Sequence, residues 1–349
     1  MIITQTPLRM SFAGGGSDLP AYYRRFGGAV VSTAIDKYIY INVNKKFDDW
    51  IRVSYSRTEE VRTADEVEHP VVRACLRKLG IAGGLEITSI ADIPSRGTGL
   101  GSSSSFTTGL LLALHAHRSR YVSPSDLAEE SCHIEIDSCG ERIGKQDQYA
   151  AAFGGMNFIR FQPDDSVLVE PILCSVEHLQ RLQSSLLMFY TGKTRSASSI
   201  LVEQSAQAES SSITQALLGR MVHLAHELRA ELNRGNVDAL GAVLDEGWQL
   251  KREVHPAVSN SIIDDWYAAA KRAGAAGGKL LGAGGGGFLV FYAPPEKHPA
   301  IELALGLKRI DVCLEPSGSR VLLYHKPLPR MAKAQFAAAG VSHAVSIQQ

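Results

Sequence analysis

The stretch IPSRGTGLGSSSS, residues 93–105, decides the fold class. It follows a predicted strand at 85–89 and leads into FTTGLLLALHAHR (106–118), which is apolar nearly all round and long enough for a buried helix. Glycine lets the backbone approach an anion closely, and the N–H groups at a helix start face that anion with the positive end of the dipole. The serines add hydroxyl donors, one of which can bind a magnesium ion. The stretch therefore predicts a phosphate-binding loop.

This loop lacks the Gly-Lys-Ser/Thr ending of a Walker A motif, which argues against an ordinary P-loop NTPase. A flexible serine-rich connector is the alternative interpretation. The apolar helix that follows favours phosphate binding, because it supplies the helix N-terminus that an anion site needs.

A second glycine-rich stretch, GAGGGG at 282–287, satisfies the pattern GxGxxG. A Rossmann fingerprint follows a strand and opens a helix, whereas these glycines open a predicted strand, FLVFYA (288–293), which disfavours a nicotinamide oxidoreductase. We expect Gly284 and Gly285 to close over a substrate, or the stretch to brace the phosphate loop. A tight turn is the alternative.

Composition and charge disfavour several classes of protein. The 349 residues include 36 basic and 36 acidic side chains, so the formal net charge is zero and a protein that coats nucleic acid or an anionic membrane is disfavoured. The five cysteines show no CxxC spacing, the first residues lack the pattern of a secretory signal, and no apolar run approaches the ~20 residues of a membrane span. We expect a cytoplasmic enzyme with reduced thiols.

The spacing of the predicted elements changes near residue 180, within 171–186. Before it, strand-like and glycine-rich segments dominate; after it come long stretches rich in Ala, Leu, Glu and Gln, which favour helix. We expect an α+β fold with two domains, 1–180 and 181–330, and a tail at 331–349. The predicted strands are 29–31, 38–43, 51–55, 85–89, 185–190, 288–293 and 319–326, and the predicted helices 70–79, 106–118, 123–139, 146–152, 198–234, 237–255 and 262–273.

A third motif, PLRMSFAGGGSDLP at 7–20, combines Arg9, three glycines and Asp18, which suits close binding of hydroxyl groups. In this order, PLRMSFAGGGSD, GTGLGSSSS and GAGGGG resemble the three motifs of the GHMP kinases, a family named for galactokinase and for homoserine, mevalonate and phosphomevalonate kinases. More narrowly, AGGGSDLPAYYRRFGGAV (13–30), GKQDQYAAAFGG (144–155) and GKTRSASSI (192–200) resemble the heptose kinase branch.

The resemblance implies a two-domain GHMP kinase fold. Its N-terminal domain would be like ribosomal protein S5 domain 2 and its C-terminal domain ferredoxin-like, with ATP and sugar in the cleft between them. The change of pattern near residue 180 agrees with this division. A homodimer is compatible with the sequence.

The resemblance also assigns roles. Asp147 matches the aspartate that takes the proton of the attacking hydroxyl, and Arg9 the cation beside it. Ser103 matches the hydroxyl that binds Mg²⁺. Glu135 lies one position from where the family spacing would put the magnesium-binding glutamate, and a one-residue difference in loop length would bring the two positions into agreement. A solvent-facing Glu135 is the alternative. The ATP phosphates would lie on Gly97, Thr98, Gly99, Leu100, Gly101, Ser102, Ser103 and Ser104.

Sugar binding is expected of Asp18, Gly15 and Gly16, with Lys145 and Gln148 as secondary candidates. The heptose branch phosphorylates the anomeric hydroxyl of D-glycero-D-manno-heptose 7-phosphate, toward GDP-heptose for surface polysaccharide. A cation must then hold the distal phosphate, and Lys193 and Arg195 are the candidates, with a solvated loop as the alternative. Arg24 and Arg25 are interpreted as surface residues.

The sequence thus predicts an ATP- and Mg²⁺-dependent kinase acting on a sugar phosphate, with no nucleic-acid or membrane partner. Kinases of fucose, galactose or another sugar, or of mevalonate, remain alternatives, since fucokinase-like relatives share much of the first motif. A diphosphomevalonate decarboxylase shares the fold. A sensor that binds ATP and sugar without catalysis is the alternative outside enzymes.

Overall fold

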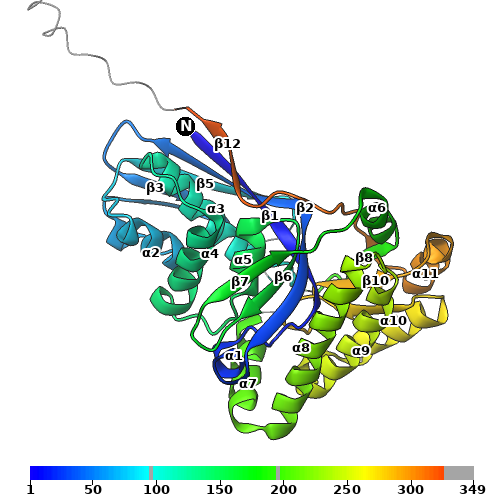
Figure 1. Cartoon of the computed structure of the whole chain (residues 1–349). Coiled ribbons are helices and arrows are strands. Elements are labelled where there is room, and N and C mark those ends of the chain that lie inside the picture. The colour runs from blue at the N-terminus through cyan, green and yellow to red at the C-terminus, as the bar shows by residue number, and fades with distance from the viewer. Residues whose placement is uncertain (94–96, 194–196, 326–349) are drawn as a thin grey trace, which may run out of the picture.

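The computed structural model describes residues 1–93, 97–193 and 197–325, apart from the side chains of 197–200. Two β-sheets form its framework, and Figure 1 shows the first reaching from the upper left to the centre of the molecule and the second to its right, with helices packed on each. The first is eight-stranded, in the order β12-β1-β2-β5-β3-β4, with β6 pairing to β2 and β7 to β6. Its strands are β1 (Ile2–Ala13), β2 (Gly28–Lys45), β3 (Ile51–Ser54), β4 (Thr58–Val61), β5 (Leu85–Ala91), β6 (Met156–Phe161), β7 (Val167–Pro171) and β12 (Arg320–Tyr324).

The centre of the first sheet is the long antiparallel pair β1 and β2. The first half of β2 is buried on both faces and pairs with β1 and β6 at once. Its second half alternates, with Ile39, Ile41 and Val43 buried, because only one face is covered there. Helix α3 (Ser102–His117) lies so close to β1 that a Cβ on Gly109 would stand 2.6 Å from Thr6 Oγ1.

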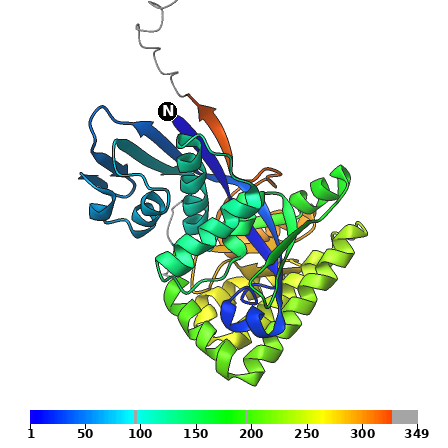
Figure 2. The same ribbon diagram turned by 60° about the vertical axis from the view of Figure 1, so that its left-hand side comes forward.

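The other helices of the first half lie beside this sheet and α3. They are α1 (Pro20–Phe26), α2 (Pro70–Lys78), α4 (Pro124–Cys132) and α5 (Gln146–Phe153), with a π-helical segment at His133–Ser138 directly after α4. Both views place α1 beside α7 at the lower end of the molecule (Figures 1 and 2).

The second sheet is four-stranded and antiparallel, in the order β11-β8-β10-β9. It comprises β8 (Leu186–Tyr190), β9 (Gly277–Leu280), β10 (Phe288–Tyr292) and β11 (Lys308–Arg309). Trp248, Phe189 and Phe291 are fully buried between this sheet and its helices. These helices and their neighbours are α6 (Val176–Ser184), α7 (Ala197–Ser210), α8 (Ser212–Asn233), α9 (Ala239–Val254), α10 (Ser261–Arg272) and α11 (His298–Leu305).

The structure confirms the α+β class and the two-domain arrangement. It confirms the helix predicted at 70–79, which begins after His69 and is followed by Gly80 at φ +61°. The strands predicted at 29–31 and 38–43 are one continuous strand, because β1 pairs along both. The helix predicted at 198–234 is two helices, since extended Ser211 interrupts it and its hydroxyl caps α8 by accepting from Thr214 N.

The last strand returns to the first sheet. The limits 181–330 assign β12 to the second domain, but β12 pairs with β1, and the N–H of Ser319 donates to the Ala151 carbonyl beside it. The proposed tail, 331–349, lies outside the described residues. Among the described helices, none has the length and apolar character needed to cross a membrane.

Candidate active site

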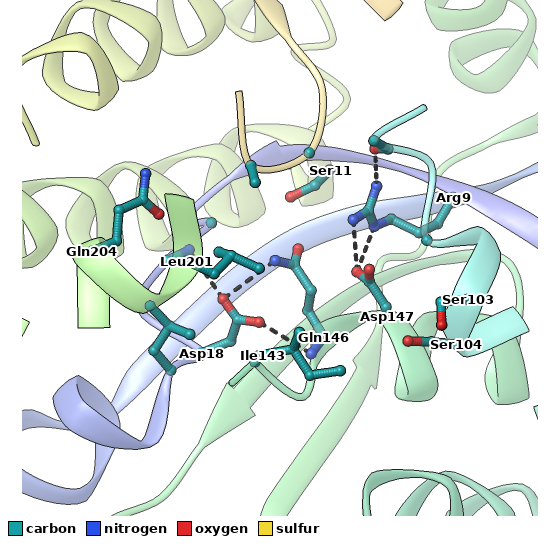
Figure 3. Close-up of a pocket in the computed structure, with 18 of the residues that line it drawn as sticks. Arg9, Ser11, Asp18, Ser103, Ser104, Ile143, Gln146, Asp147, Leu201 and Gln204 are labelled. Atoms are coloured by element: carbon teal, nitrogen blue, oxygen red, sulfur yellow. Dashed lines mark hydrogen bonds and ion pairs between the residues drawn. The ribbon is translucent and has the colours of Figure 1, made fainter. Parts of the chain in front are cut away.

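A cavity of about 600 Å³ lies where the two domains meet. The first domain contributes the C-terminal part of β1, the glycines that follow it, the phosphate loop and the start of α5. The second contributes side chains of α7, α8 and α9, Lys279 of β9 and the residues Gly282 and Ala283. All three motifs that the sequence singled out therefore meet at one cavity, and Figure 3 shows part of its lining.

The phosphate loop forms one end of the cavity. Gly97, Thr98, Gly99, Gly101, Ser102, Ser103 and Ser104 line it, whereas Leu100 is buried and its carbonyl accepts from Arg9 N at 3.0 Å. Helix α3 begins directly after Gly101, whose φ of +75° suits glycine. The free N–H groups of this helix start are therefore available to an anion.

The GAGGGG stretch at 282–287 braces the phosphate loop, which is one of the two roles expected for it. A Cβ on Gly282 would stand 2.3 Å from Gly99 Cα, so the two backbones touch where only glycine fits. Gly284 and Gly285 do not line the cavity; they pack on Val258, whose carbonyl accepts from Gly285 N at 3.0 Å.

Arg9 and Asp147 form a buried ion pair beside the phosphate loop. Arg9 Nε and Nη2 each lie 2.7 Å from Asp147 Oδ1, and Nη1 donates to the Gly99 carbonyl at 2.6 Å. The Arg9 side chain is 5% exposed and that of Asp147 25%, so the carboxylate keeps access to the cavity. Figure 3 shows the guanidinium joining the loop to the carboxylate. The pair thus stands where an acceptor hydroxyl and a terminal phosphate could meet.

Ser103 and Glu135 come together although 32 residues separate them. Ser103 Oγ donates to Glu135 Oε1 at 3.0 Å, and Gln148 Nε2 donates to Oε2 at 2.6 Å. Burial raises the pKa of the Glu135 carboxyl, and the surrounding hydroxyl and amide donors partly offset this. Glu135 lies in the π-helical segment and is buried, so it is not the solvent-facing residue of the alternative interpretation.

These oxygens fit a magnesium ion. A hydroxyl and a carboxylate stand side by side at the phosphate loop, both lining the cavity, and Mg²⁺ commonly takes one or two protein oxygens together with phosphate and water. The Glu135 carboxylate has no cation beside it in the described part of the chain, so a bound cation would offset its burial.

Asp18 is held rigidly at the other end of the cavity. Gly16 N donates to its Oδ1 at 3.0 Å, Gln146 Nε2 to the same oxygen at 3.2 Å and Gln146 N to Oδ2 at 3.3 Å. Burial and the nearby Asp147 charge raise the pKa of Asp18, while the backbone N–H groups lower it. A Cβ on Gly144 would stand 1.8 Å from Oδ2, so glycine is required there. Gly15 and Gly16 line the cavity beside it.

Several predicted residues lie elsewhere. Lys145 turns away from the cavity and donates to the Asp165 carbonyl at 3.0 Å, because Asp165 gathers Lys145, Arg24 and the Tyr23 hydroxyl. Gln148 stands behind Glu135 rather than in the cavity. Lys193 is exposed and does not line the cavity, and Arg195 lies outside the described residues.

The sequence reasoning missed Lys251, Lys279, Ser11 and Gln146, all of which line the cavity. Lys251 carried a detectable signal, since it follows Leu244 and Trp248 at helical spacing and so falls on the buried face of α9. Lys279 lies within a fully buried strand between Gly278 and Leu280. A lysine inside an apolar pattern is the feature that could have found both.

Two family models match the chain. The model described as GHMP kinases N terminal domain matches residues 62–155, and that described as GHMP kinases C terminal matches residues 228–308. Together they cover half of the chain, and they lie in the order in which the two domains occur.

Among characterised relatives, the D-glycero-alpha-D-manno-heptose 7-phosphate kinase of Campylobacter jejuni is 29% identical over 85% of this chain and 90% of its own length. The bifunctional fucokinase/GDP-fucose pyrophosphorylase of Arabidopsis thaliana is 27% identical over 74% of this chain and 27% of its own length.

Solved structures share the fold. A putative sugar kinase from Campylobacter jejuni has a TM-score of 0.73 and 27% identity, covering 92% of this chain and 97% of its own. A D-glycero-D-manno-heptose 1-phosphate kinase from Bacteroides thetaiotaomicron has a TM-score of 0.77 at 24% identity, covering 93% and 100%. At that identity the likeness concerns the fold alone.

Proposed function

The chain belongs to the GHMP kinases, and we propose that it transfers the γ-phosphoryl group of ATP to the anomeric hydroxyl of D-glycero-D-manno-heptose 7-phosphate. It is a sugar kinase of this family, since both domains match the family models and the curated relatives are sugar kinases. The product would be the 1,7-bisphosphate, an intermediate toward GDP-heptose for surface polysaccharide.

The observation that carries the proposal is the Arg9–Asp147 pair at the phosphate loop. Asp147 offers a carboxylate oxygen to the acceptor hydroxyl and takes its proton as the new O–P bond forms. The bond between the γ-phosphorus and its bridging oxygen breaks, and ADP leaves. Arg9 orients the carboxylate and offsets negative charge on the phosphoryl group in transit. The step needs positioning and charge stabilisation rather than a covalent enzyme intermediate.

The remaining residues position the two substrates. The N–H groups at the start of α3 and the loop hydroxyls hold the ATP phosphates. Asp18, fixed by Gly16 and Gln146, can accept hydrogen bonds from two neighbouring sugar hydroxyls. Ser103 and Glu135 would hold Mg²⁺, which supplies positive charge to the phosphate oxygens. The heptose phosphate itself is supported by the Campylobacter jejuni relative and by the resemblance of segments 13–30, 144–155 and 192–200.

The test is magnesium-dependent ADP release from ATP with D-glycero-D-manno-heptose 7-phosphate, beside mannose, fucose, galactose and mevalonate. Turnover that is strongest with the heptose phosphate is expected. Preference for fucose or galactose would keep the kinase and replace the acceptor. ATP binding without ADP release from any acceptor would contradict the proposal and favour a non-catalytic sensor.

A further inference from the structure

Two lysines from the second domain face the cavity. Lys251 of α9 is 8% exposed and Lys279 of β9 is 5% exposed, and both line the cavity wall opposite the first domain. Lys251 Nζ donates to the Gly282 carbonyl, and Lys279 Nζ donates to the Phe12 carbonyl at 3.4 Å. Within the described residues, the hydrogen-bond acceptors of both ammonium groups are thus backbone oxygens, which are neutral.

Neither lysine has a carboxylate within ion-pair distance in the described part of the chain, although the charge of Asp18 acts on Lys251 from farther away. Arg9, on the facing wall, is paired with the carboxylate of Asp147. Burying an ammonium without an anion is costly, and two such groups near each other cost more. Burial and Arg9 lower the pKa of Lys251 to about 8, although Asp18 opposes this, and burial, Lys251 and Arg9 lower the pKa of Lys279 well below its ordinary value. This arrangement is stabilised when an anion enters.

Ser11 adds an unused donor at the same place. Its hydroxyl is buried, lines the cavity and has no hydrogen-bond partner among the described residues. Ser11 adjoins Phe12, whose carbonyl accepts from Lys279, so the hydroxyl and this ammonium share one section of wall. Buried hydroxyls are normally satisfied, and an unsatisfied one that faces a cavity indicates a ligand atom.

The position of Ser11 relative to Arg9 indicates which part of the substrate it meets. The two residues lie two positions apart on β1 and point to the same side of the strand, about 7 Å from each other. In Figure 3 Ser11 lies on the side of Arg9 away from Ser103 and Ser104. Ser11 therefore lies beside Arg9 and away from the serines that begin α3.

We propose that Lys251, Lys279 and Ser11 form the binding site for the phosphate group that a sugar-phosphate acceptor carries at the end away from its reacting hydroxyl. The inference rests on the proposed function and names the residues that would select a phosphorylated acceptor. A phosphate monoester carries between one and a half and two negative charges at neutral pH, which suits two ammonium groups and a hydroxyl donor. Lys193, predicted for this role from the sequence, is exposed and outside the cavity lining.

The experiment compares D-glycero-D-manno-heptose 7-phosphate with unphosphorylated D-glycero-D-manno-heptose. The variants are Lys251→Met, Lys279→Met and Ser11→Ala. Lys271→Met is the matched control, because Lys271 also donates to a backbone carbonyl of the second domain, at 2.7 Å from Ala276 O, but does not line the cavity. Two readouts are used: kcat/KM for ADP release, and calorimetric affinity for each sugar without nucleotide. Lys→Gln variants replace any Met variant that fails to fold.

The wild type is expected to prefer the phosphorylated sugar in both readouts. Each lysine variant should reduce that preference by about 10- to 100-fold, mainly through KM and the calorimetric affinity, the range expected for a hydrogen bond to a charged group. Ser11→Ala should reduce it by less than tenfold. Lys271→Met should leave it unchanged.

Three outcomes would overturn the inference. A wild type that binds both sugars equally has no phosphate anchor. An equal fall of kcat on both sugars would mean that the lysines act on the transferred phosphoryl group. If both lysine variants keep the wild-type preference for the phosphorylated sugar, the lysines do not bind its phosphate group. Absence of turnover would reject the proposed function alone, since calorimetry still reports whether the lysines hold the phosphate.

Discussion

The charged side chains on the two walls of the cavity differ in their partners. On the first-domain wall Arg9 is paired with Asp147, and Glu135 accepts from Ser103 and Gln148, so each charge has donors or a counter-ion within hydrogen-bonding distance. On the second-domain wall Lys251 and Lys279 are buried against backbone carbonyls only. The Arg9–Asp147 pair of the first wall is formed before a substrate enters, which suits a site that must hold a fixed geometry for reaction. The second is complete only with an anion present.

The largest effect on activity is expected from Asp147→Asn, on the first-domain wall. The amide keeps the size of the side chain but takes no proton, and general-base catalysis contributes about 10²- to 10⁴-fold, so kcat should fall by that range. Affinity for ATP should stay close to that of the wild type, because the phosphate loop is untouched. Steady-state ADP release and nucleotide titration measure the two quantities. Full retained activity would show that Asp147 is not the base.

Glu135→Gln tests whether the Glu135 carboxylate, on the same wall as Asp147, binds Mg²⁺. The amide still accepts from Ser103 but carries no negative charge, so the Mg²⁺ concentration for half-maximal activity should rise by about tenfold or more. Titration of ADP release with MgCl₂ measures this. Asp137→Asn is the control, since Asp137 belongs to the same π-helical segment but faces His133 at the surface. An unchanged requirement in Glu135→Gln would exclude Glu135 as a metal ligand.

The second wall should respond to pH. Burial and Arg9 lower the pKa of Lys251 to about 8, while Asp18 opposes this. Burial and the same neighbouring cations lower the pKa of Lys279 well below its ordinary value. Lys251 is therefore charged below about pH 8 and loses its proton above it. KM for the sugar phosphate should rise by up to about tenfold between pH 8 and 9. The acceptor phosphate keeps its charge in this range, since its second pKa is about 6.

The control for this pH dependence is Lys251→Met, which should lack the rise. The unphosphorylated sugar should show no such rise in the wild type either. A rise of equal size with both sugars would assign it to another group, and a flat profile for the sugar phosphate would show that Lys251 does not titrate in contact with it.

The contrast between the walls also marks what the sequence could predict. Local signals were sufficient for α2, with His69 before it and Gly80 after it, and for a glycine-rich loop leading into α3. The motif at 7–20 drew attention to Arg9 and Asp18, and the resemblance to the GHMP kinases assigned Ser103, Glu135 and Asp147; the structure brings all five to one cavity. Glycine and serine patterns at helix ends act over a few residues, so a single sequence records them.

What the sequence could not predict depends on distant partners. The return of β12 to β1 joins residues more than 300 positions apart. Strands β6 and β7 escaped notice because their alternation is short and their pairing with β2 decides their place. Lys251 and Lys279 were missed for the same reason: their chemistry appears only when the second domain closes the cavity over Ser11. Lys145 was misplaced because Asp165, 20 residues later, attracts it.

The smallest expected effect concerns stability and separates the two walls directly. Lys279→Met removes a buried amine without a counter-ion and fills its place with an apolar chain of similar length, so the free energy of unfolding should rise by about 1 kcal/mol. Arg9→Met leaves Asp147 buried beside the loop without its partner, so the free energy of unfolding should fall. Thermal denaturation at pH 7 without ligand should show Tm moving a few degrees upward for the first and downward for the second. If Lys279→Met lowered Tm as Arg9→Met is expected to, Lys279 would stabilise the ligand-free protein. The second wall would then not need an anion to offset the burial of this lysine.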